Sequence, residues 1–245
     1  MSSKKVKHQK NYFNKISDEY EKQNELSFEF MTKLSKLVSP YIKGNVLDIG
    51  NGGLVYYDIS KATSLTIADL AAELLANPKK LHKGKFVDLK KKNLKIVEAD
   101  VMDLPFQDES FDVVTMFNVA HHLSVDKKAD SKKNVEKAFS EIYRVLKKDG
   151  LFVLHENCPS IYYGAFQSLF YEYMFHILER FGKPLPHFYS VKFIKKTLIE
   201  KDFFVGREFS IEWSDRVYQP VFPMFAPPRW LWNLVLKNEL LLCKK

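Results

Sequence analysis

The chain has 245 residues, of which 46% are hydrophobic and 28% are charged, a balance that suits a folded domain with a substantial core and excludes dominant disorder. Its net charge of +8 favours anionic partners, although scattered lysines equally fit a solvated surface, which we prefer over nucleic-acid binding. Cys158 and Cys243 are the only cysteines and lie far apart, so we expect no disulfide framework, no metal site and a reducing, cytoplasmic setting. No signal peptide or membrane span is expected, because no uncharged apolar stretch is long enough.

The chain begins with a polar, basic stretch, after which residues 12–38 have the spacing of a helix. Apolar side chains recur on one face of this segment at helical intervals, and Pro40 is expected to end it, because proline removes a backbone donor and clashes with the preceding turn. The apolar face consists of Leu26, Phe30, Leu34 and Leu37.

Five short apolar segments follow, at residues 45–49, 64–68, 94–98, 111–117 and 151–154. The first ends in glycines, and the second and third each end in an aspartate. Because stretches of helical character separate these segments, they predict parallel strands that are joined by crossover helices.

The clearest crossover helix precedes the fifth strand. We expect Asp130 or Ser131 to cap its start, and Gly150 to follow its last turn as the C′ residue. Its apolar stripe consists of Val135, Ala138, Phe139, Ile142, Val145 and Leu146.

Aromatic side chains become frequent after residue 156. Their spacing predicts one long amphipathic helix within residues 156–190, and a second helix is expected near residues 191–201. Two final strands, near residues 205–213 and 234–242, are separated by a loop rich in proline. The apolar face of the long helix would consist of Phe166, Leu169, Phe170, Tyr173 and Ile177.

The most informative stretch is the glycine-rich turn after the first strand, at residues 46–53. Glycines allow a backbone to approach a ligand closely, but phosphate-binding domains share this feature. Here Val55 stands where a dinucleotide fingerprint has its third glycine, and Asp48 would repel a phosphate but suits the cationic end of an amino acid. Asp69 and Asp100 end the next two strands, at the edge where open α/β sheets bind ligands.

The ordered motifs between Val46 and Leu154 resemble those of the class I S-adenosylmethionine-dependent methyltransferases, in particular the small-molecule branch called methyltransferase type 11. No single motif is specific, but the whole set stands at the spacing of that family. The matching segments, in chain order, are 47–52, Asp69, 99–106, 110–114, 118–123 and 141–151.

The resemblance implies an α/β fold with a Rossmann-like, doubly wound, mostly parallel seven-stranded sheet, an antiparallel last strand and a helical, aromatic lid. Within a single domain overall, residues 41–155 and 190–245 would form the Rossmann-like cofactor-binding part. Residues 1–40 would form an N-terminal helical lid, and residues 156–189 a helical insertion at the acceptor site. The implied reaction transfers a methyl group from S-adenosyl-L-methionine to a small-molecule acceptor, such as a metabolite, quinone or lipid, and releases S-adenosyl-L-homocysteine.

The resemblance also implies roles for individual residues. Asp48 and the backbone of residues 50–53 would hold the amino acid end of the cofactor, and Asp69 would accept hydrogen bonds from both ribose hydroxyls. Asp100 would bind the adenine amine, and the two residues after it would pack on the ring. The expected cofactor-binding residues are Tyr20, Asp48, Gly50, Asn51, Gly52, Asp69, Leu70, Asp100, Val101, Met102 and Asn118.

A protonated acceptor needs a general base, and four candidates lie near the ends of the fourth and fifth strands: His121, His122, His155 and Glu156. We select His122 or His155, with a histidine that only completes a loop hydrogen bond as the alternative. Aromatic residues after position 160 would line the acceptor pocket or, alternatively, form the core of the lid itself. The expected acceptor-binding residues are Tyr162, Tyr163, Phe166, His187, Tyr189 and Trp213.

Other classes of function compete with a small-molecule methyltransferase. An RNA- or protein-directed methyltransferase would suit the basic charge, but residues 118–121 lack the Asn/Asp-Pro-Pro-aromatic tetrad of enzymes that methylate bases. Residues 222–236 could touch a lipid surface, as in a peripheral membrane enzyme. A non-catalytic module that binds S-adenosylmethionine is the third alternative. The methylated atom stays open between oxygen, nitrogen and carbon, and the oligomeric state is undetermined.

Overall fold

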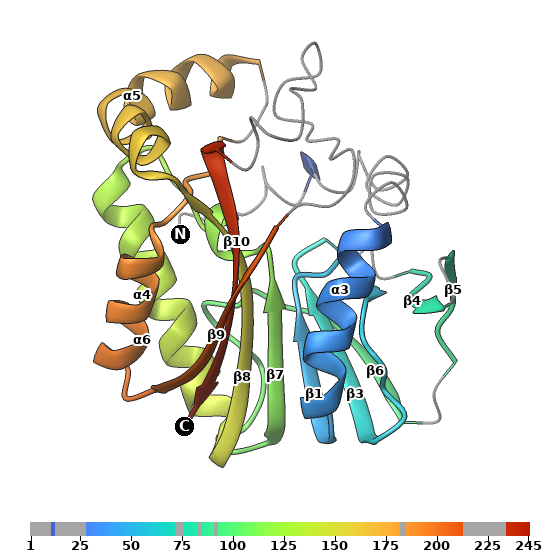
Figure 1. Cartoon of the computed structure of the whole chain (residues 1–245). Coiled ribbons are helices and arrows are strands. Elements are labelled where there is room, and N and C mark those ends of the chain that lie inside the picture. The colour runs from blue at the N-terminus through green and yellow to red at the C-terminus, as the bar shows by residue number, and fades with distance from the viewer. Residues whose placement is uncertain are drawn as a thin grey trace.

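The computed structural model describes residues 11–12, 28–71, 76–82, 85–90, 93–181, 185–212 and 234–245. Seven strands form one sheet in the order β6-β3-β1-β7-β8-β10-β9 (Figure 1). Strand β10 runs antiparallel between β8 and β9, whereas β6, β3, β1, β7 and β8 are parallel to one another. The predicted sheet, with its antiparallel last strand, is confirmed. The strands are β1 (Gly44–Ile49), β3 (Ala62–Asp69), β6 (Leu94–Glu98), β7 (Phe111–Phe117), β8 (Leu146–Pro159), β9 (Phe204–Ile211) and β10 (Leu236–Lys244).

Strand β8 is much longer than residues 151–154, which were all that the apolar pattern predicted. Polar residues precede and follow that apolar core, so the pattern breaks at both ends. The strand continues because it has a hydrogen-bonded neighbour on each side: β7 as far as His155, and β10 as far as Pro159. The extension therefore buries polar side chains at residues 155–157, in the centre of the sheet.

Helices cover the two faces of this sheet (Figure 1). Helix α3 (Phe28–Val38) packs Phe30 and Leu34 into one apolar core, and α4 (Lys128–Val145) and α6 (Val191–Glu200) pack into the other. Helix α3 gives way to the 3₁₀ turn η1 (Ser39–Tyr41), which contains Pro40, so the predicted end of the first helix is confirmed. Residues 13–27 of the predicted helix lie outside the described residues.

The apolar stripe predicted for α4 is buried, but both predicted caps are wrong. The N-cap residue is Lys127, which makes no side-chain cap bond, and Ser131 lies inside the helix. The Ser131 hydroxyl instead accepts a hydrogen bond from the Val125 amide and lies within hydrogen-bond distance of the Val125 and Lys127 carbonyls, to either of which it can donate. At the other end Leu146 is the C-cap residue, and Gly150 belongs to β8, because the chain enters the strand without a glycine turn.

The expectation of a crossover helix in every connection is wrong for two of them. Residues 50–61 and 99–110 are fully described and contain no helix. The first segment combines three glycines with the strand-forming pair of β2 (Leu54–Val55), and the second is a series of turns around Asp103 and Pro105. Strand β2 pairs with β4 (Lys79–His82), and β4 pairs with β5 (Lys85–Asp88), in a small sheet that the sequence did not predict.

The long aromatic helix is α5 (Ile161–Arg180), which begins at the N-cap Ser160 and follows β8 directly (Figure 1). The helix is confirmed, but it buries a different face from the one predicted. Its buried residues are Gln167, Tyr171 and Phe175. On the predicted face Phe166, Leu169 and Tyr173 are 55%, 76% and 68% exposed. Among the described residues, no helix is both long and apolar enough to cross a membrane.

Candidate functional site

The carboxyl ends of three neighbouring strands bring the predicted cofactor residues together. Strand β1 lies between β3 and β7, so Asp48 near the end of β1, Asp69 at the end of β3 and Asn118 just after β7 share one edge of the sheet. The turn after β1 has left-handed backbone at Gly50 (φ 73°), Gly52 (φ 57°) and Gly53 (φ 76°). The predicted glycine turn is therefore present in a conformation that glycine adopts more readily than other residues.

Gly50 also lies too close for a side chain to Val119, the N-cap residue of the 3₁₀ turn that follows β7. A Cβ atom built there would stand 2.4 Å from Cγ2 of Val119, in a residue with φ of 73°. We expect Gly50→Ala to lower the free energy of unfolding by more than the roughly 1–2 kcal/mol of a left-handed alanine, because the clash adds to that cost.

Thermal denaturation of Gly50→Ala and of the double variant Gly50→Ala/Val119→Ala tests this prediction. Gly50→Ala should lower the Tm less in the Val119→Ala background than in wild type. In that background the clash with Val119 is gone and only the backbone strain at position 50 remains. Wild-type stability in Gly50→Ala would contradict the described conformation of the turn.

Asp48 is fully buried beneath the turn, and one of its two carboxylate oxygens accepts hydrogen bonds. Its Oδ1 accepts hydrogen bonds from Nδ2 of Asn51 at 2.8 Å and from the Thr115 hydroxyl at 2.8 Å, and Tyr57 hydrogen-bonds to Thr115 at 3.0 Å. Burial raises the pKa of Asp48 from 3.8 to about 6, against the lowering effect of these bonds. Oδ2 of Asp48 and Oδ1 of Asn51 are buried without a hydrogen-bond partner in the described part of the chain. These two oxygens are available to an ammonium group.

Asp69 closes the other side of the turn. Its Oδ2 accepts a hydrogen bond from the Gly52 amide at 2.9 Å, and its Oδ1 accepts one from the Ala71 amide at 2.8 Å. Burial raises its pKa, and the backbone bonds oppose that rise. Because each carboxylate oxygen has a second acceptor position, the group still has capacity for two hydroxyl donors. The orphaned oxygens below the turn and this paired carboxylate beside it fit S-adenosylmethionine.

The other predicted cofactor residues lie on the loops after β3 and β6, or outside the described part of the chain. Asp100 is half-buried and accepts a hydrogen bond from the Met102 amide at 2.9 Å, while Val101 and Met102 are buried in the same apolar core as α4. Leu70 is half-buried just after β3. Tyr20 lies outside the described residues.

The two histidines selected as bases occupy different surroundings. His155 is fully buried between the rings of Phe30 and Phe117, whose centroids lie 5.6 and 6.1 Å from its own, and burial lowers its pKa to about 4. His122 ends the 3₁₀ turn η3 (Ala120–His122), and burial together with neighbouring His121 lowers its pKa well below the ordinary range. Both imidazoles are therefore neutral, and weak bases, at physiological pH.

The sequence singled out His121 and Glu156 as separate candidate bases and missed their pairing. Nδ1 of His121 forms a short hydrogen bond with Oε1 of Glu156, which also accepts one from the Asn157 amide at 2.9 Å. Both side chains are buried, on the face of β8 opposite His155. The pair ties η3 to β8, and period-two alternation along a longer β8 would have indicated that Glu156 points away from His155.

Replacing Glu156 tests how much the His121–Glu156 pair contributes to the stability of the fold. We expect Glu156→Ala to lower the free energy of unfolding by about 3 kcal/mol, since it leaves buried donors without a partner. The matched control is Glu208→Ala, which breaks the partly exposed Lys195–Glu208 pair (2.6 Å) and should cost less than about 1 kcal/mol. Equal losses of unfolding free energy for the two variants in urea denaturation would mean that the buried pair contributes no more to stability than the partly exposed pair.

The predicted acceptor residues that the structure describes differ widely in exposure. Tyr162 is 80% exposed and Phe166 is 55% exposed, whereas Tyr189 is buried in the core and donates its hydroxyl to the Ser131 carbonyl at 3.1 Å. His187 is buried against Tyr171 and Tyr189, and Tyr163 packs against the apolar core of α3. The alternative, that these aromatics form local cores, describes Tyr189 and His187 better. Trp213 lies outside the described residues.

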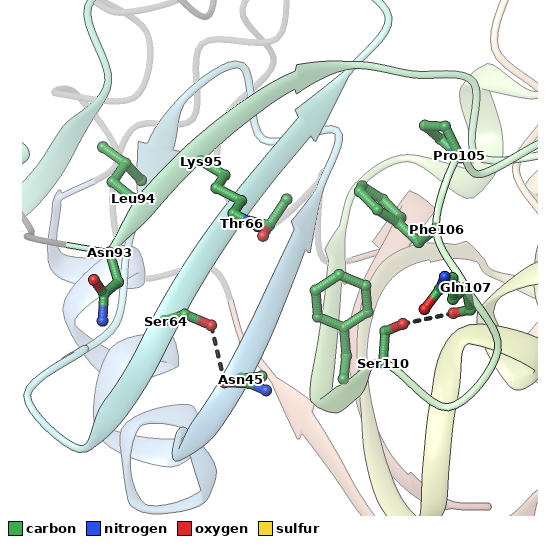
Figure 2. A pocket seen from close by; sticks show the side chains of 11 residues that line it. Asn45, Ser64, Thr66, Asn93, Leu94, Lys95, Pro105, Phe106, Gln107 and Ser110 are labelled. Carbon is green, nitrogen blue, oxygen red and sulfur yellow. Dashed lines mark hydrogen bonds between the residues drawn. The ribbon is translucent and has the colours of Figure 1, made fainter.

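A hollow of about 580 Å³ opens at the opposite end of the sheet (Figure 2). Asn45, Ser64 and Lys95 line it near the amino ends of their strands, and Ser64 donates a hydrogen bond to Asn45 at 3.0 Å. The loop at residues 105–107 forms another wall, where a crossover helix was expected. Because its strand ends are the wrong ones for cofactor binding in open α/β sheets, we do not assign this hollow to the site.

Comparison with known proteins identifies the family of the chain. A family model described as "Methyltransferase domain" matches residues 47–154. The "Ubiquinone/menaquinone biosynthesis C-methyltransferase UbiE" of Rickettsia prowazekii (strain Madrid E) is 30% identical over 186 residues, which cover 71% of this chain and 69% of that protein. The UbiE protein of Rickettsia typhi (strain ATCC VR-144 / Wilmington) is 29% identical over the same shares of both chains.

Solved structures share the fold at low sequence identity. A methyltransferase in complex with the Haloferax volcanii Trm112 activator has a TM-score of 0.63 and 16% identity, and the match covers 94% of this chain and 96% of that one. Geranyl diphosphate C-methyltransferase from Streptomyces coelicolor A3(2), solved with S-adenosyl-L-homocysteine, has a TM-score of 0.55 and 10% identity over 86% of this chain and 77% of that one.

Proposed function

The chain belongs to the S-adenosylmethionine-dependent methyltransferases, and we propose that it methylates a ring carbon of a small, quinol-like acceptor. It is an enzyme of the small-molecule branch of that family, with S-adenosylmethionine as its cofactor. The observation that carries the proposed acceptor is the 30% identity to a quinone-biosynthesis C-methyltransferase over 71% of this chain.

The cofactor, when bound, supplies a methyl group activated by a sulfonium centre and leaves as S-adenosylhomocysteine, and the proton of the methylated ring carbon would pass to water. Asp48 and Asn51 would hold its ammonium group through their orphaned oxygens, and Asp69 would hold its ribose hydroxyls. Binding at this edge would place the methyl group near Asn118, at the end of β7. The contribution of these residues to rate is alignment of the reacting groups and exclusion of water, which together account for several kcal/mol in such displacements.

The uncharged histidines support a neutral acceptor. Burial holds the pKa of His155 at about 4 and that of His122 well below the ordinary range. Neutral imidazoles suit hydrogen bonding to a hydroxyl or carbonyl, whereas a carboxylate or phosphate acceptor would need a cation to balance its charge.

Transfer of a ¹³C-labelled methyl group tests the proposal. The protein is incubated with S-adenosyl-L-[methyl-¹³C]methionine and 1,4-dihydroxynaphthalene under reducing conditions, and the product is analysed by ¹³C NMR. We expect the label on a ring carbon. Label on oxygen, or no transfer by protein that binds the cofactor, would contradict the proposed acceptor class. Asp69→Ala serves as the control in which cofactor binding is strongly weakened.

A further inference from the structure

A group of buried polar side chains lies on the sheet face that packs against α3. Asn157 of β8 and Asn238 of β10 are direct cross-strand neighbours, and His155 lies two residues before Asn157 on the same face of β8. Their exposed fractions are 0% for His155, 4% for Asn157 and 1% for Asn238. We call these three residues the polar cluster.

Most polar atoms of this cluster make no hydrogen bond of normal geometry. Both ring nitrogens of His155, Oδ1 of Asn157 and both amide atoms of Asn238 make no hydrogen bond of normal geometry in the part of the chain that the structure describes. The Asn238 side chain nevertheless lies close enough to the His155 imidazole to raise its pKa against the effect of burial, so these two side chains are neighbours that the free protein leaves poorly paired. The one side-chain bond of the cluster runs from Nδ2 of Asn157 to Oδ1 of Asn118, at 3.0 Å. Because buried polar groups are almost always paired, five unpaired atoms at adjacent positions call for an occupant with polar atoms of its own.

The cluster adjoins the end of the sheet that would hold the cofactor. Asn118 bridges the two regions: it follows β7, its amide donates to the His155 carbonyl at 2.9 Å, and its side chain accepts from Asn157. Asn118 is only half-buried, whereas the cluster behind it is closed off. An acceptor that reached past Asn118 would therefore meet the polar cluster.

The chemistry of the cluster is neutral and bordered by aromatic rings. The His155 ring lies 5.6 Å from that of Phe30 and 6.1 Å from that of Phe117. A neutral imidazole offers one donor and one acceptor, and the free amide atoms offer further donors and acceptors. A hydroxyl group both donates and accepts, so it matches this mixture, whereas a carboxylate only accepts.

We propose that His155, Asn157 and Asn238 form the acceptor subsite and bind the hydroxyl oxygen of a neutral, flat aromatic acceptor. This inference rests on the proposed function and deepens it. In this role His155 positions the acceptor as a hydrogen-bonding group, in place of the general base that the sequence suggested. Asn157 and Asn238, which the sequence did not single out, select for an oxygen substituent.

Stability of the free protein gives the first test, independent of activity. Asn238→Leu replaces an unpaired buried amide with an apolar group of similar size, so we expect a higher Tm than wild type. The matched control is Asn134→Leu, since the Asn134 amide does have a partner, the Leu123 carbonyl at 2.9 Å, and its loss should lower Tm. A fall in Tm for Asn238→Leu as large as for the control would show a structural role and overturn the proposal.

Acceptor binding gives the second test. In calorimetry with S-adenosylhomocysteine present, wild-type protein should bind 1,4-dihydroxynaphthalene at least about tenfold more tightly than Asn238→Leu does, while both bind S-adenosylhomocysteine equally. The discrimination should vanish for 1,4-dimethoxynaphthalene, which has no hydroxyl to donate. Equal binding of the diol by both proteins, or none by wild type that binds S-adenosylhomocysteine, would overturn the subsite. Failure of wild type to bind S-adenosylhomocysteine would instead contradict the proposed function, and the Tm comparison would still decide the role of the cluster.

Discussion

Replacing Asp69 with alanine is expected to weaken S-adenosylmethionine binding by about 100-fold or more. The variant loses hydrogen bonds from two ribose hydroxyls to a charged acceptor, each worth roughly 1.5–3 kcal/mol, and 1.4 kcal/mol is a factor of ten in affinity. It also removes the acceptor of the Gly52 amide, so the glycine turn loses the bond that holds it against β3. Isothermal titration calorimetry of wild-type and variant proteins measures the difference.

Asp112→Ala is the matched control for this substitution. The Asp112 carboxylate also accepts a backbone hydrogen bond, from the Asn45 amide at 2.7 Å, but it lies at the amino ends of the strands. We expect this variant to lose some stability and to keep wild-type cofactor affinity. Asp69→Asn, which retains one carbonyl acceptor, should fall between wild type and Asp69→Ala. Wild-type affinity in Asp69→Ala would rule out Asp69 as the ribose ligand.

Replacing Asp48 with asparagine is expected to stabilise the cofactor-free protein while it weakens cofactor binding. A pKa of about 6 in the folded chain, against 3.8 ordinarily, means that burial penalises the ionised form by about 3 kcal/mol. Because the folded pKa is the higher one, the stability that protonated Asp48 contributes is present below the unfolded pKa. It is lost as the pH rises through the folded pKa. As the pH rises, the free energy of unfolding of the wild-type protein should fall by this amount, and that of Asp48→Asn should not.

Urea denaturation at about pH 4 and about pH 8 tests the sign of this effect. The gap between variant and wild type should widen toward the higher pH, since an asparagine at position 48 keeps an oxygen for Asn51 and Thr115 and has no charge to bury. A constant gap across that range would contradict a raised pKa for Asp48.

Cofactor affinity should depend on pH in the opposite direction. The ammonium group needs the ionised carboxylate, so wild-type affinity should be constant above about pH 7 and fall by up to tenfold per pH unit below about pH 6. For Asp48→Asn, calorimetry should show weaker binding without this dependence. Denaturation and calorimetry together would show that Asp48 strengthens cofactor binding and lowers the stability of the cofactor-free protein.

The sequence was most informative for features that depend on one strand, helix or turn alone. Apolar runs between polar turns located β7 to the residue. They also indicated that Asp48 and Asp69 stand at the carboxyl ends of strands and that the glycine turn follows the first strand. Helix α4 was recognised from its buried stripe, yet its caps were not, because Ser131 hydrogen-bonds backward within the helix instead of capping it.

Features that depend on pairing between distant segments could not be predicted. Asn157 and Asn238 meet only because β10 pairs antiparallel with an extended β8, a register that an apolar run at 151–154 does not reveal. The buried face of α5 was misjudged for a related reason. Aromatic residues occupy more than one of its faces, so helical spacing alone does not identify the face that meets the rest of the protein.

Calorimetric titration of the wild-type chain with S-adenosylmethionine and with S-adenosylhomocysteine tests the central claim most directly. We predict one site per chain for each ligand, with affinity in the micromolar range and a rise in Tm that grows with ligand concentration. No heat of binding and no change in Tm with either ligand would contradict the assignment of the β1–β3–β7 edge as a methyltransferase cofactor site.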